Sequence, residues 1–433
     1  MHTLAQLRSG ELAGISRLDL SCGLTELPPE VFALADSLEV LNLSGNALSS
    51  LPADLPRLHK LKVLFCADNR FTRVPEVVGA CAALSLVGFK SNQLTELPAA
   101  ALPAKLRWLV LTDNQLTELP VELGRRPHLQ KLALAGNRLS QLPDSMAQCR
   151  ALGLLRMSAN RFEQIPPWLL ELPKLAWLAV GGNPWNAARE ARVLKQAHLP
   201  DLGWAALQMG ELLGQGASGV IHAAHWPAGP LGRRELAVKV FKGEVTSDGW
   251  PHSEWAASLE AGAHPQLISA SARLTGHPQG AEGLLMPRIG SEFSTLAGPP
   301  SLSSCTRDVY PDSTQFSAEV LQGMARGVVD AARHLHARGI SHGDLYAHNL
   351  LWNGQGEAWL GDFGAASLLP DELGRPQRQA FERLEVLAFG HLLEEWLSRC
   401  PDAAPALHQL QAACVNPEPA ARPLFAELAP RLN

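Results

Sequence analysis

At 433 residues, the chain is longer than one ordinary hydrophobic core can serve, so two or three domains are expected. Hydrophobic residues make up 46% of the sequence and charged residues 18%, a balance that excludes extended disorder. The formal net charge of −5 excludes the basic footprint by which proteins bind nucleic acids or anionic membranes. Seven cysteines without a CxxC pair favour reduced thiols over disulfides or a zinc site.

Targeting and membrane-spanning segments are not expected. The first residues lack the basic stretch and apolar run of a secretory signal. No stretch approaches the roughly 18 uncharged apolar residues of a membrane helix. Residues 186–207, between the two halves, carry Arg189, Glu190, Arg192, Lys195 and Asp201. We therefore expect a soluble, cytoplasmic protein.

The N-terminal half repeats the pattern LxxLxLxxN. Its copies start at steps of 23 residues, with one step of 22, at Ile15, Leu38, Leu61, Leu84, Leu106, Leu129, Leu152 and Leu175. The central LxL predicts a short strand with alternate residues buried. The Asn can bond backbone groups of its own and the adjacent coil, because buried backbone groups need partners. The period therefore predicts a solenoid of about eight coils.

Residues 15–185 resemble leucine-rich-repeat proteins, in the 23-residue variety whose copies end in Leu-Pro. A terminal coil cannot bury its own apolar face, so the resemblance implies caps at both ends. We expect residues 1–14 to form the N-terminal cap and residues 186–207 the C-terminal cap and linker.

Solenoids of this family bind partners on their concave strand face. Two columns of positions there, which also include Arg156, are unusually apolar for sites expected to be exposed; the apolar residues are Val63, Phe65, Trp108, Val110, Leu154 and Trp177. A contiguous exposed apolar patch marks an interface. Two occupants remain open: a protein substrate or regulator, or the C-terminal half of the chain itself.

A second pattern begins near residue 208. A glycine loop spans residues 214–219 between two predicted strands, and Lys239 follows in Ala237-Val238-Lys239. The glycines let the backbone approach phosphates closely, and the lysine supplies positive charge. This order matches the glycine loop and strand lysine of protein kinases.

Two further motifs carry the chemistry of phosphoryl transfer. His342-Gly343-Asp344-Leu345-Tyr346-Ala347-His348-Asn349 has the pattern HxDxxxxN, and Asp362-Phe363-Gly364 follows it. The attacking hydroxyl needs a carboxylate to orient or deprotonate it, which suits Asp344. Magnesium needs oxygen ligands, which suits Asn349 and Asp362.

Residues 208–433 thus resemble the protein-kinase family. The resemblance implies a bilobal α+β domain beside the α/β solenoid, with ATP and Mg²⁺ as cofactors and Ser or Thr of a protein as acceptor. It makes Glu254 the helix partner of Lys239, with Glu260 as the alternative. The expected nucleotide-binding residues are Gly214, Gln215, Gly216, Ala217, Ser218, Gly219, Val220, Ala237, Lys239 and, near the gatekeeper place, Met286.

The pattern departs from the family at three places. Gly343 replaces the Arg that usually pairs with a phosphorylated activation loop, so that switch is expected to be absent. Tyr346 replaces the Lys that usually contacts the γ-phosphate, and His348 or Lys239 could supply the missing charge. The segment between Asp362 and Glu385 is short and lacks Ala-Pro-Glu. These departures keep two alternatives open: a repeat scaffold with a weak or inactive nucleotide-binding domain, and a small-molecule phosphotransferase.

Overall fold

The computed structural model describes the chain except for residues 197–199, 217–218, 230–234, 243–244, 247 and 433. It comprises two compact units, one of residues 1–155 and 160–172, the other of residues 156–159 and 173–433. The segment 156–159 and the last strand of the repeats therefore belong to the same unit as the C-terminal half.

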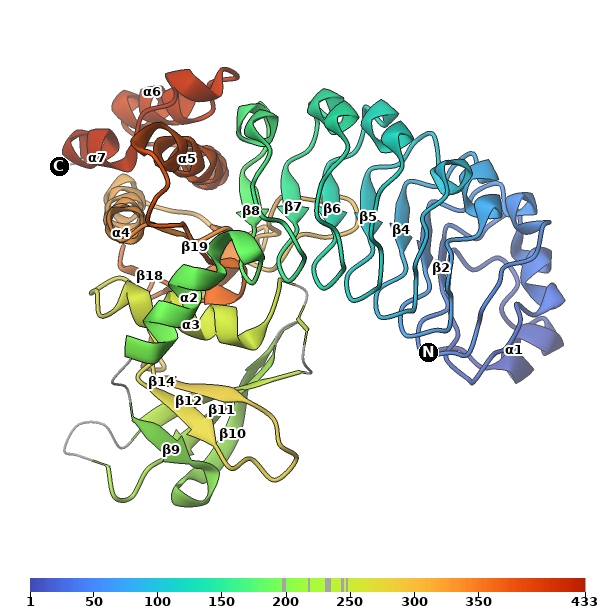
Figure 1. Ribbon diagram of the computed structural model, residues 1–433, viewed down its shortest axis with the longest axis horizontal. Helices are drawn as coiled ribbons and strands as arrows, with labels where there is room; N and C mark the ends of the chain where they lie inside the picture. The colour runs from blue at the N-terminus through green and yellow to red at the C-terminus, as the bar shows by residue number, and fades with distance from the viewer. Residues whose placement is uncertain (197–199, 217–218, 230–234, 243–244, 247, 433) are drawn as a thin grey trace. The chain divides into compact units, whose positions relative to one another are not determined.

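The repeats form one eight-stranded sheet whose strand order follows the chain, and the pairs from the first to the sixth strand are parallel (Figure 1). The strands are β1 (Arg17–Asp19), β2 (Val40–Asn42), β3 (Val63–Phe65), β4 (Leu86–Gly88), β5 (Trp108–Val110), β6 (Lys131–Ala133), β7 (Leu154–Arg156) and β8 (Trp177–Ala179). Helix α1 (Leu4–Ser9) precedes them, with Thr3 as its N-cap. Short 3₁₀ helices follow the strands, namely η1 (Pro29–Leu34), η2 (Leu55–Arg57), η3 (Glu76–Ala80), η4 (Ala99–Ala101), η5 (Val121–Arg125), η6 (Asp144–Gln148) and η7 (Pro167–Glu171). The predicted solenoid is confirmed.

The repeated asparagine links neighbouring coils. Asn137 donates from Nδ2 to the carbonyl of Leu134 in its own coil and to that of Leu111 in the preceding one, both at 2.9 Å. Its Oδ1 accepts the backbone N–H of Leu116 at 3.0 Å. One buried side chain thus satisfies three backbone groups that water cannot reach. The predicted asparagine ladder is confirmed here.

The concave face is less exposed than the sequence suggested. Val63 is only 5% exposed, and Phe65, Trp108 and Val110 are half-buried. The rings of Phe65 and Trp108 meet edge to face, 6.4 Å between centroids, and the Lys131 ammonium lies 4.3 Å from the centroid of Trp108. Lys131 and Trp108 lie on adjacent strands, about 4.8 Å apart. Phe65 and Trp108 lie on either side of β4, where Gly88 has no side chain and leaves room for the Phe65 ring. The predicted apolar patch is therefore partly covered by its own members.

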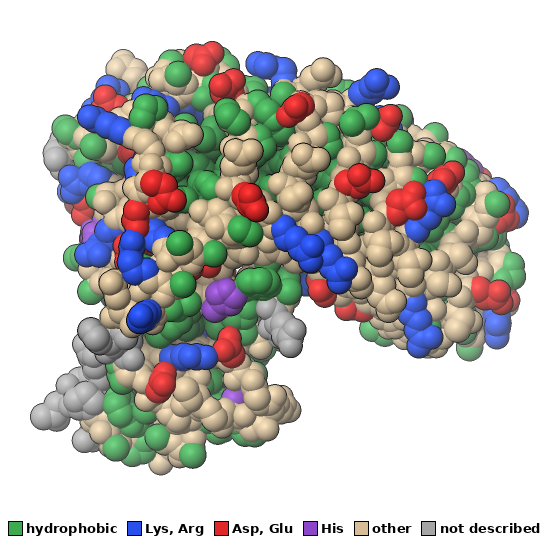
Figure 2. Space-filling model, in the orientation of Figure 1, with side chains coloured by type: hydrophobic (Ala, Val, Ile, Leu, Met, Phe, Trp, Pro, Cys, Tyr) green, Lys and Arg blue, Asp and Glu red, His purple; other side chains and the backbone are tan. Residues whose placement is uncertain are grey.

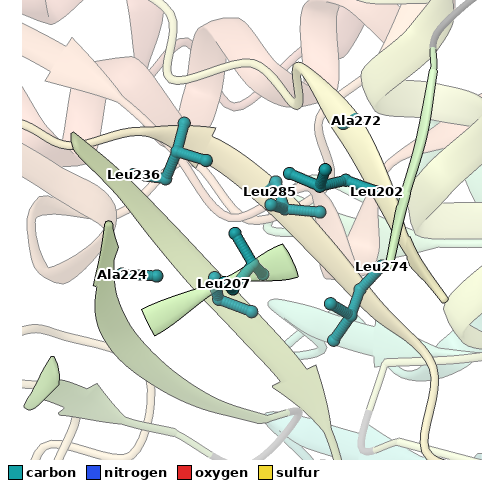
Figure 3. Close-up of a cluster of buried hydrophobic side chains, with 8 residues drawn as sticks. Leu202, Leu207, Ala224, Leu236, Ala272, Leu274 and Leu285 are labelled. Atoms are coloured by element: carbon teal, nitrogen blue, oxygen red, sulfur yellow. The ribbon is translucent and has the colours of Figure 1, made fainter. Parts of the chain in front are cut away.

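In the unit that contains the C-terminal half, β8 is followed by helix α2 (Pro184–Gln196) and a six-stranded sheet in the order β10-β11-β12-β14-β13-β9. Its strands are β9 (Asp201–Gly203), β10 (Gln208–Gln215), β11 (Gly219–His225), β12 (Glu235–Phe241), β13 (Ala272–Thr275) and β14 (Gly283–Pro287). The pairs are antiparallel except β13 with β9. Strand β9 comes from the segment that the sequence predicts to be linker. Figure 3 shows the core of this sheet, which comprises Leu202, Leu207, Ala224, Leu236, Val238, Ala272, Leu274 and Leu285.

The remaining part of this unit is mainly helical (Figure 1). Its helices are α3 (Pro251–Ala261), α4 (Ala318–Ala337), α5 (Arg375–Leu397), α6 (Pro405–Cys414) and α7 (Phe425–Leu428). Its short strands are β15 (Ser294–Thr295), β16 (Ile340–Ser341), β17 (Leu350–Trp352), β18 (Ala358–Leu360) and β19 (Ser367–Leu368). Helix α4 begins where the Ser317 hydroxyl accepts the N–H of Val320, and its apolar stripe is buried.

The surface carries no field of a single sign in the view of Figure 2, where acidic and basic side chains are interspersed. This agrees with the small net charge of −5. Among the described residues, no helix has the length and apolar character needed to span a membrane.

Candidate active site

Lys239 lies between two carboxylates. From strand β12, its Nζ donates to Glu254 Oε1 of helix α3 at 2.6 Å and to Asp362 Oδ1 at 3.0 Å. The Lys239 and Glu254 side chains are only 6% and 5% exposed. The alternative partner, Glu260, instead accepts from Arg189 Nη2 at 2.8 Å. Of the two predicted glutamates, the structure thus brings Glu254 to Lys239.

The charges of Lys239, Glu254 and Asp362 shift one another's pKa values. Burial disfavours the Lys239 ammonium, but the carboxylates of Asp362 and Glu254 outweigh it and raise the lysine pKa. Burial raises the pKa of Glu254 to about 7, against the opposing pull of Lys239. Burial also disfavours ionised Asp362, yet Lys239 and the Gly364 N–H lower the pKa of that carboxyl to about 2. Lys239 and Asp362 are therefore both charged at neutral pH.

Asp344 and Asn349 meet in the catalytic-loop motif. The Asn349 amide, in the 3₁₀ helix η9 (Ala347–Asn349), donates to Asp344 Oδ2 at 2.8 Å and to the Asp344 carbonyl at 2.9 Å. The Gly361 N–H donates to the Asn349 carbonyl at 3.0 Å, and His342 Nε2 pairs with the Gly361 carbonyl at 3.0 Å. These bonds hold the catalytic-loop motif against Gly361, which precedes Asp362. The four polar residues predicted for the site, Lys239, Asp344, Asn349 and Asp362, therefore lie in one region.

Two oxygens of this group suit a magnesium ion. Among the described residues, Asn349 Oδ1 and Asp362 Oδ2 accept no hydrogen bond, whereas Asn349 Nδ2 and Asp362 Oδ1 are engaged. Mg²⁺ is bound by one or two protein oxygens together with waters and substrate phosphates. The described part of the chain has no cluster of three or more His, Cys, Asp or Glu able to hold a metal alone. The residues present fit Mg²⁺ carried by a nucleotide.

The glycine loop connects β10 and β11. Gly214 and Gln215 end β10, and Gly219 and Val220 begin β11. The Gly216 N–H donates to the Gly219 carbonyl at 3.0 Å. A Cβ on Gly219 would lie 2.7 Å from the Val240 carbonyl, so this position requires glycine.

The other predicted nucleotide-binding residues are placed as follows. Ala217 and Ser218 lie outside the described residues. Ala237 of β12 pairs in register with Met286 of β14, and Met286 is half-buried. Both positions thus lie on the sheet strands next to Lys239.

Family comparisons agree with both halves. The description "Protein tyrosine and serine/threonine kinase" matches residues 207–385, and two leucine-rich-repeat descriptions match residues 37–58 and 104–162. This chain joins leucine-rich repeats to a protein-kinase domain.

Similar proteins share only part of the chain. A "Probable inactive serine/threonine-protein kinase roco10" of Dictyostelium discoideum is 34% identical over 122 residues, covering 27% of this chain and 5% of that protein. "Probable serine/threonine-protein kinase pats1" of the same organism is 36% identical over 119 residues, covering 25% of this chain and 4% of its own length. "Transforming growth factor beta activator LRRC32" of Mus musculus is 34% identical over 123 residues, covering 27% and 18%. The chain thus matches less than a fifth of each of these relatives.

The kinase domain anchors its catalytic loop on Glu385 of helix α5. Glu385 Oε1 accepts the Gly343 N–H at 2.6 Å and the Ser341 hydroxyl at 3.0 Å, and Oε2 pairs with His336 Nε2 at 2.5 Å. Both His336 and Glu385 are buried. Burial disfavours the charged forms of both side chains, but each charge stabilises the opposite charge of its partner. The pKa of His336 is therefore raised and that of Glu385 is lowered.

This pair gives a pH-dependent contribution to stability. A histidine with a raised pKa in the folded state stabilises fully below its unfolded value of about 6.5 and loses that contribution as pH rises through the folded pKa. His336→Gln is expected to lower the free energy of unfolding by roughly 3 kcal/mol at pH 6, with the difference from wild type shrinking toward pH 9. Urea unfolding at several pH values measures this difference, with the exposed His408→Gln as the control. A difference that stays constant or grows with pH would contradict the charged pair.

Arg156 is a site residue that the motifs did not identify. Its Nε donates to Asp248 Oδ1 at 2.6 Å, its Nη1 to the Gly343 carbonyl at 2.9 Å, and its Nη2 to Asp344 Oδ1. Its side chain is only 5% exposed. Arg156 belongs to the last residues of strand β7 and stands 188 positions from Asp344. The only sequence signal was its place in the concave columns of the repeats.

Trp177 also contacts the catalytic loop. Its ring stacks on Tyr346, 4.3 Å between centroids and 7° between planes, and its Nε1 donates to the Leu345 carbonyl at 3.1 Å. Its other neighbour is His391, at 5.6 Å. The prediction that Trp177 is exposed is wrong, because this stacking leaves it only 3% exposed. For this residue the structure realises the intramolecular alternative.

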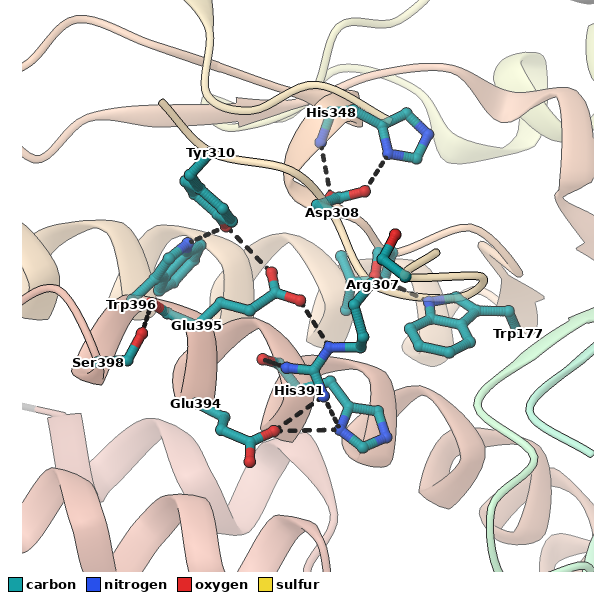
Figure 4. Close-up of polar contacts among 12 residues, drawn as sticks. Trp177, Arg307, Asp308, Tyr310, His348, His391, Glu394, Glu395, Trp396 and Ser398 are labelled. Atoms are coloured by element: carbon teal, nitrogen blue, oxygen red, sulfur yellow. Dashed lines mark hydrogen bonds and ion pairs between the residues drawn. The ribbon is translucent and has the colours of Figure 1, made fainter. Parts of the chain in front are cut away.

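A partly buried polar network lies beside the loop (Figure 4). His348 is one of the two residues suggested as a substitute for the missing lysine. Its Nδ1 is hydrogen-bonded to Asp308 Oδ1 at 2.8 Å. Arg307 bridges Glu395 and Glu394 at 2.7 and 2.8 Å, and Tyr310 donates to Glu395 at 3.1 Å. His348 is therefore committed to this network.

Proposed function

We propose that the kinase domain transfers the γ-phosphoryl group of ATP to a hydroxyl group of a protein, on Ser or Thr. The observation that carries the proposal is the convergence of Lys239, Glu254 and Asp362 with Asp344 and Asn349. These side chains come from four separate segments, and phosphoryl transfer requires all of their chemical types in one place.

Each residue has a defined role in this reaction. Lys239, held by Glu254, binds phosphate oxygens of ATP, while Asn349 and Asp362 offer oxygens to Mg²⁺. Asp344 orients the acceptor hydroxyl and takes its proton. The acceptor oxygen forms a bond to the γ-phosphorus, the bond from that phosphorus to the β,γ-bridging oxygen breaks, and ADP leaves. Bound Mg²⁺ neutralises charge on the phosphates.

The repeats would select the protein on which this chemistry acts. Phe65, Trp108 and Val110 are half-buried neighbours on the concave face, and partly exposed aromatic residues are enriched at binding hot spots. Trp177 is excluded from that surface because it stacks on Tyr346.

Two observations favour other functions. Asp344 is already bound by Arg156, which suits a scaffold whose kinase domain holds nucleotide without transferring phosphate. The segment after Asp362 is short, since η10 (Phe363–Ala365) and β19 lead directly to α5 at Arg375, which suits a small acceptor.

One experiment separates the three functions. The full chain is incubated with Mg²⁺ and γ-labelled ATP, with mixed protein acceptors in one arm and with small hydroxyl and amine compounds in the other. We expect label on Ser or Thr of protein, identified by mass spectrometry. Label only on small compounds would establish a small-molecule phosphotransferase. Nucleotide binding without any transfer would establish a scaffold.

A further inference from the structure

The catalytic loop has no lysine or arginine to bind the terminal phosphate. The residues where most kinases carry Arg and Lys are Gly343 and Tyr346. The loop's two histidines are engaged, His342 with the Gly361 carbonyl and His348 with Asp308. Lys239 is shared by Glu254 and Asp362. A lysine or arginine for this phosphate therefore has to come from another part of the chain.

Packing prevents the loop from carrying its own arginine. Gly343 has φ +73°, and a Cβ there would lie 2.6 Å from the Ala365 carbonyl and 2.7 Å from the Leu178 carbonyl of β8. A side chain at this position would be strained and would also collide with the backbone. The loss of the arginine is thus coupled to the close approach of strand β8.

Arg156 brings a guanidinium to the same place. It bonds the Gly343 carbonyl and the Asp344 carboxylate, so its charge lies at the second and third residues of the loop motif. A guanidinium has five N–H donors, and Arg156 uses three of them on Asp248, Gly343 and Asp344 within the described chain. Two donors remain for two oxygens of an oxyanion such as a phosphate.

The local charge balance also favours a cation at this position. Asp248, Glu254, Asp344 and Asp362 contribute four carboxyl groups to this region, and two described cations, Lys239 and Arg156, are bonded to them. Arg156 is as buried as Lys239, with 5% and 6% of the side chains exposed. Without Arg156, a phosphate next to Asp344 would lie beside a carboxylate with no cation bonded to it, which would repel the phosphate.

Tyr346 supplies a second, independent sign of a bound group. Its side chain is 3% exposed, and its hydroxyl has no hydrogen-bond partner among the described residues. An unpaired buried hydroxyl is costly, so a partner is expected when the site is in use. The tyrosine replaces the usual phosphate-binding lysine and is held by the stacked Trp177.

We propose that Arg156, supplied by the repeat strand β7, is the catalytic cation that binds the terminal phosphate of ATP beside Asp344. This rests on the proposed kinase function. It also assigns the repeats a part in catalysis, because Arg156 and Trp177 come from repeat strands. The competing role is inhibitory: Arg156 would only block Asp344 and would bind no phosphate.

The test compares binding of Mg·ATP and Mg·ADP, which differ by the phosphate that Arg156 would touch. Arg156→Gln keeps a hydrogen-bonding side chain and removes the charge. We expect it to weaken ATP binding roughly 10-fold or more with ADP binding unchanged, and to lower kcat by about 100-fold, the loss typical of removing one transition-state donor. Arg156→Lys keeps the charge without the planar fork, so it should weaken ATP by several-fold only, again with ADP unchanged. The exposed Arg161→Gln is the control.

Other outcomes overturn the proposal. Faster phosphoryl transfer by Arg156→Gln than by wild type would identify Arg156 as inhibitory. Equal changes for ATP and ADP would identify a residue that only maintains the site, and unchanged binding and kcat would remove Arg156 from the reaction. Thermal unfolding checks that each variant folds, and Arg156→Lys decides the ATP-to-ADP comparison if Arg156→Gln does not. A wild-type chain without transfer would refute the kinase function, whereas the two binding constants would still decide what Arg156 contacts.

Discussion

Asp344→Asn is expected to slow phosphoryl transfer by roughly 100- to 10,000-fold, the range for loss of a positioned general base. The substitution is nearly isosteric, and its one remaining oxygen can still accept from either the Asn349 amide or Arg156. What is lost is the negative charge that orients the acceptor hydroxyl and takes its proton. Because Asp344 does not hold the nucleotide, the affinity for Mg·ATP should be kept or increased.

The measurement is kcat at saturating ATP together with the ATP dissociation constant. Asp312→Asn, at an exposed aspartate of the same unit, is the matched control and should behave as wild type. Transfer that survives Asp344→Asn at more than a tenth of the wild-type rate would remove Asp344 from the chemistry, whatever happens to binding.

Lys239→Met is expected to abolish productive nucleotide binding and to lower kcat/KM by at least about 100-fold. It also leaves a buried carboxylate without its cation, and breaking a buried pair by removing one partner costs about 3–5 kcal/mol. Glu254 can escape part of that cost by taking up a proton. Its pKa is already raised to about 7 by burial, and removal of the lysine raises it further.

The stability loss should therefore depend on pH. Below pH 7 Glu254 of the variant is protonated, so the loss of stability is small. Above pH 8 it costs free energy either to ionise this buried carboxyl without Lys239 or to keep it protonated, so the loss of stability grows. Urea unfolding of wild type, Lys239→Met and the exposed control Lys195→Met at pH 6 and pH 8.5 measures this. An equal loss at both pH values would show that Glu254 and Lys239 are not coupled as the structure places them.

Helix geometry explains why one part of the site could not be predicted from sequence. Glu254 and Glu260 both lie on α3, six positions apart, so at about 100° per residue they point in directions about 120° apart. Their distances from Lys239 along the sequence left both glutamates as possible partners of the lysine. The packing of α3 orients Glu254 toward Lys239 and Glu260 toward Arg189.

The concave face shows the same limit. The repeat pattern correctly placed Phe65, Trp108 and Trp177 beside the buried leucines, because side chains alternate along a strand. It could not predict that Trp177 stacks on Tyr346, which is far away in the chain. It also gave no reason for the substitutions Gly343 and Tyr346, which make sense only with β8 and Trp177 against the loop.

The sequence by itself determined the repeat solenoid, its asparagine ladder and the motifs of the kinase domain, because each depends on spacing within a few residues or on a regular period. Only the tertiary structure decided which glutamate meets Lys239, and only it brought Arg156 to Asp344 across 188 positions. Such contacts depend on how separate elements pack, and no local pattern of residues records the partner of a side chain that reaches across them.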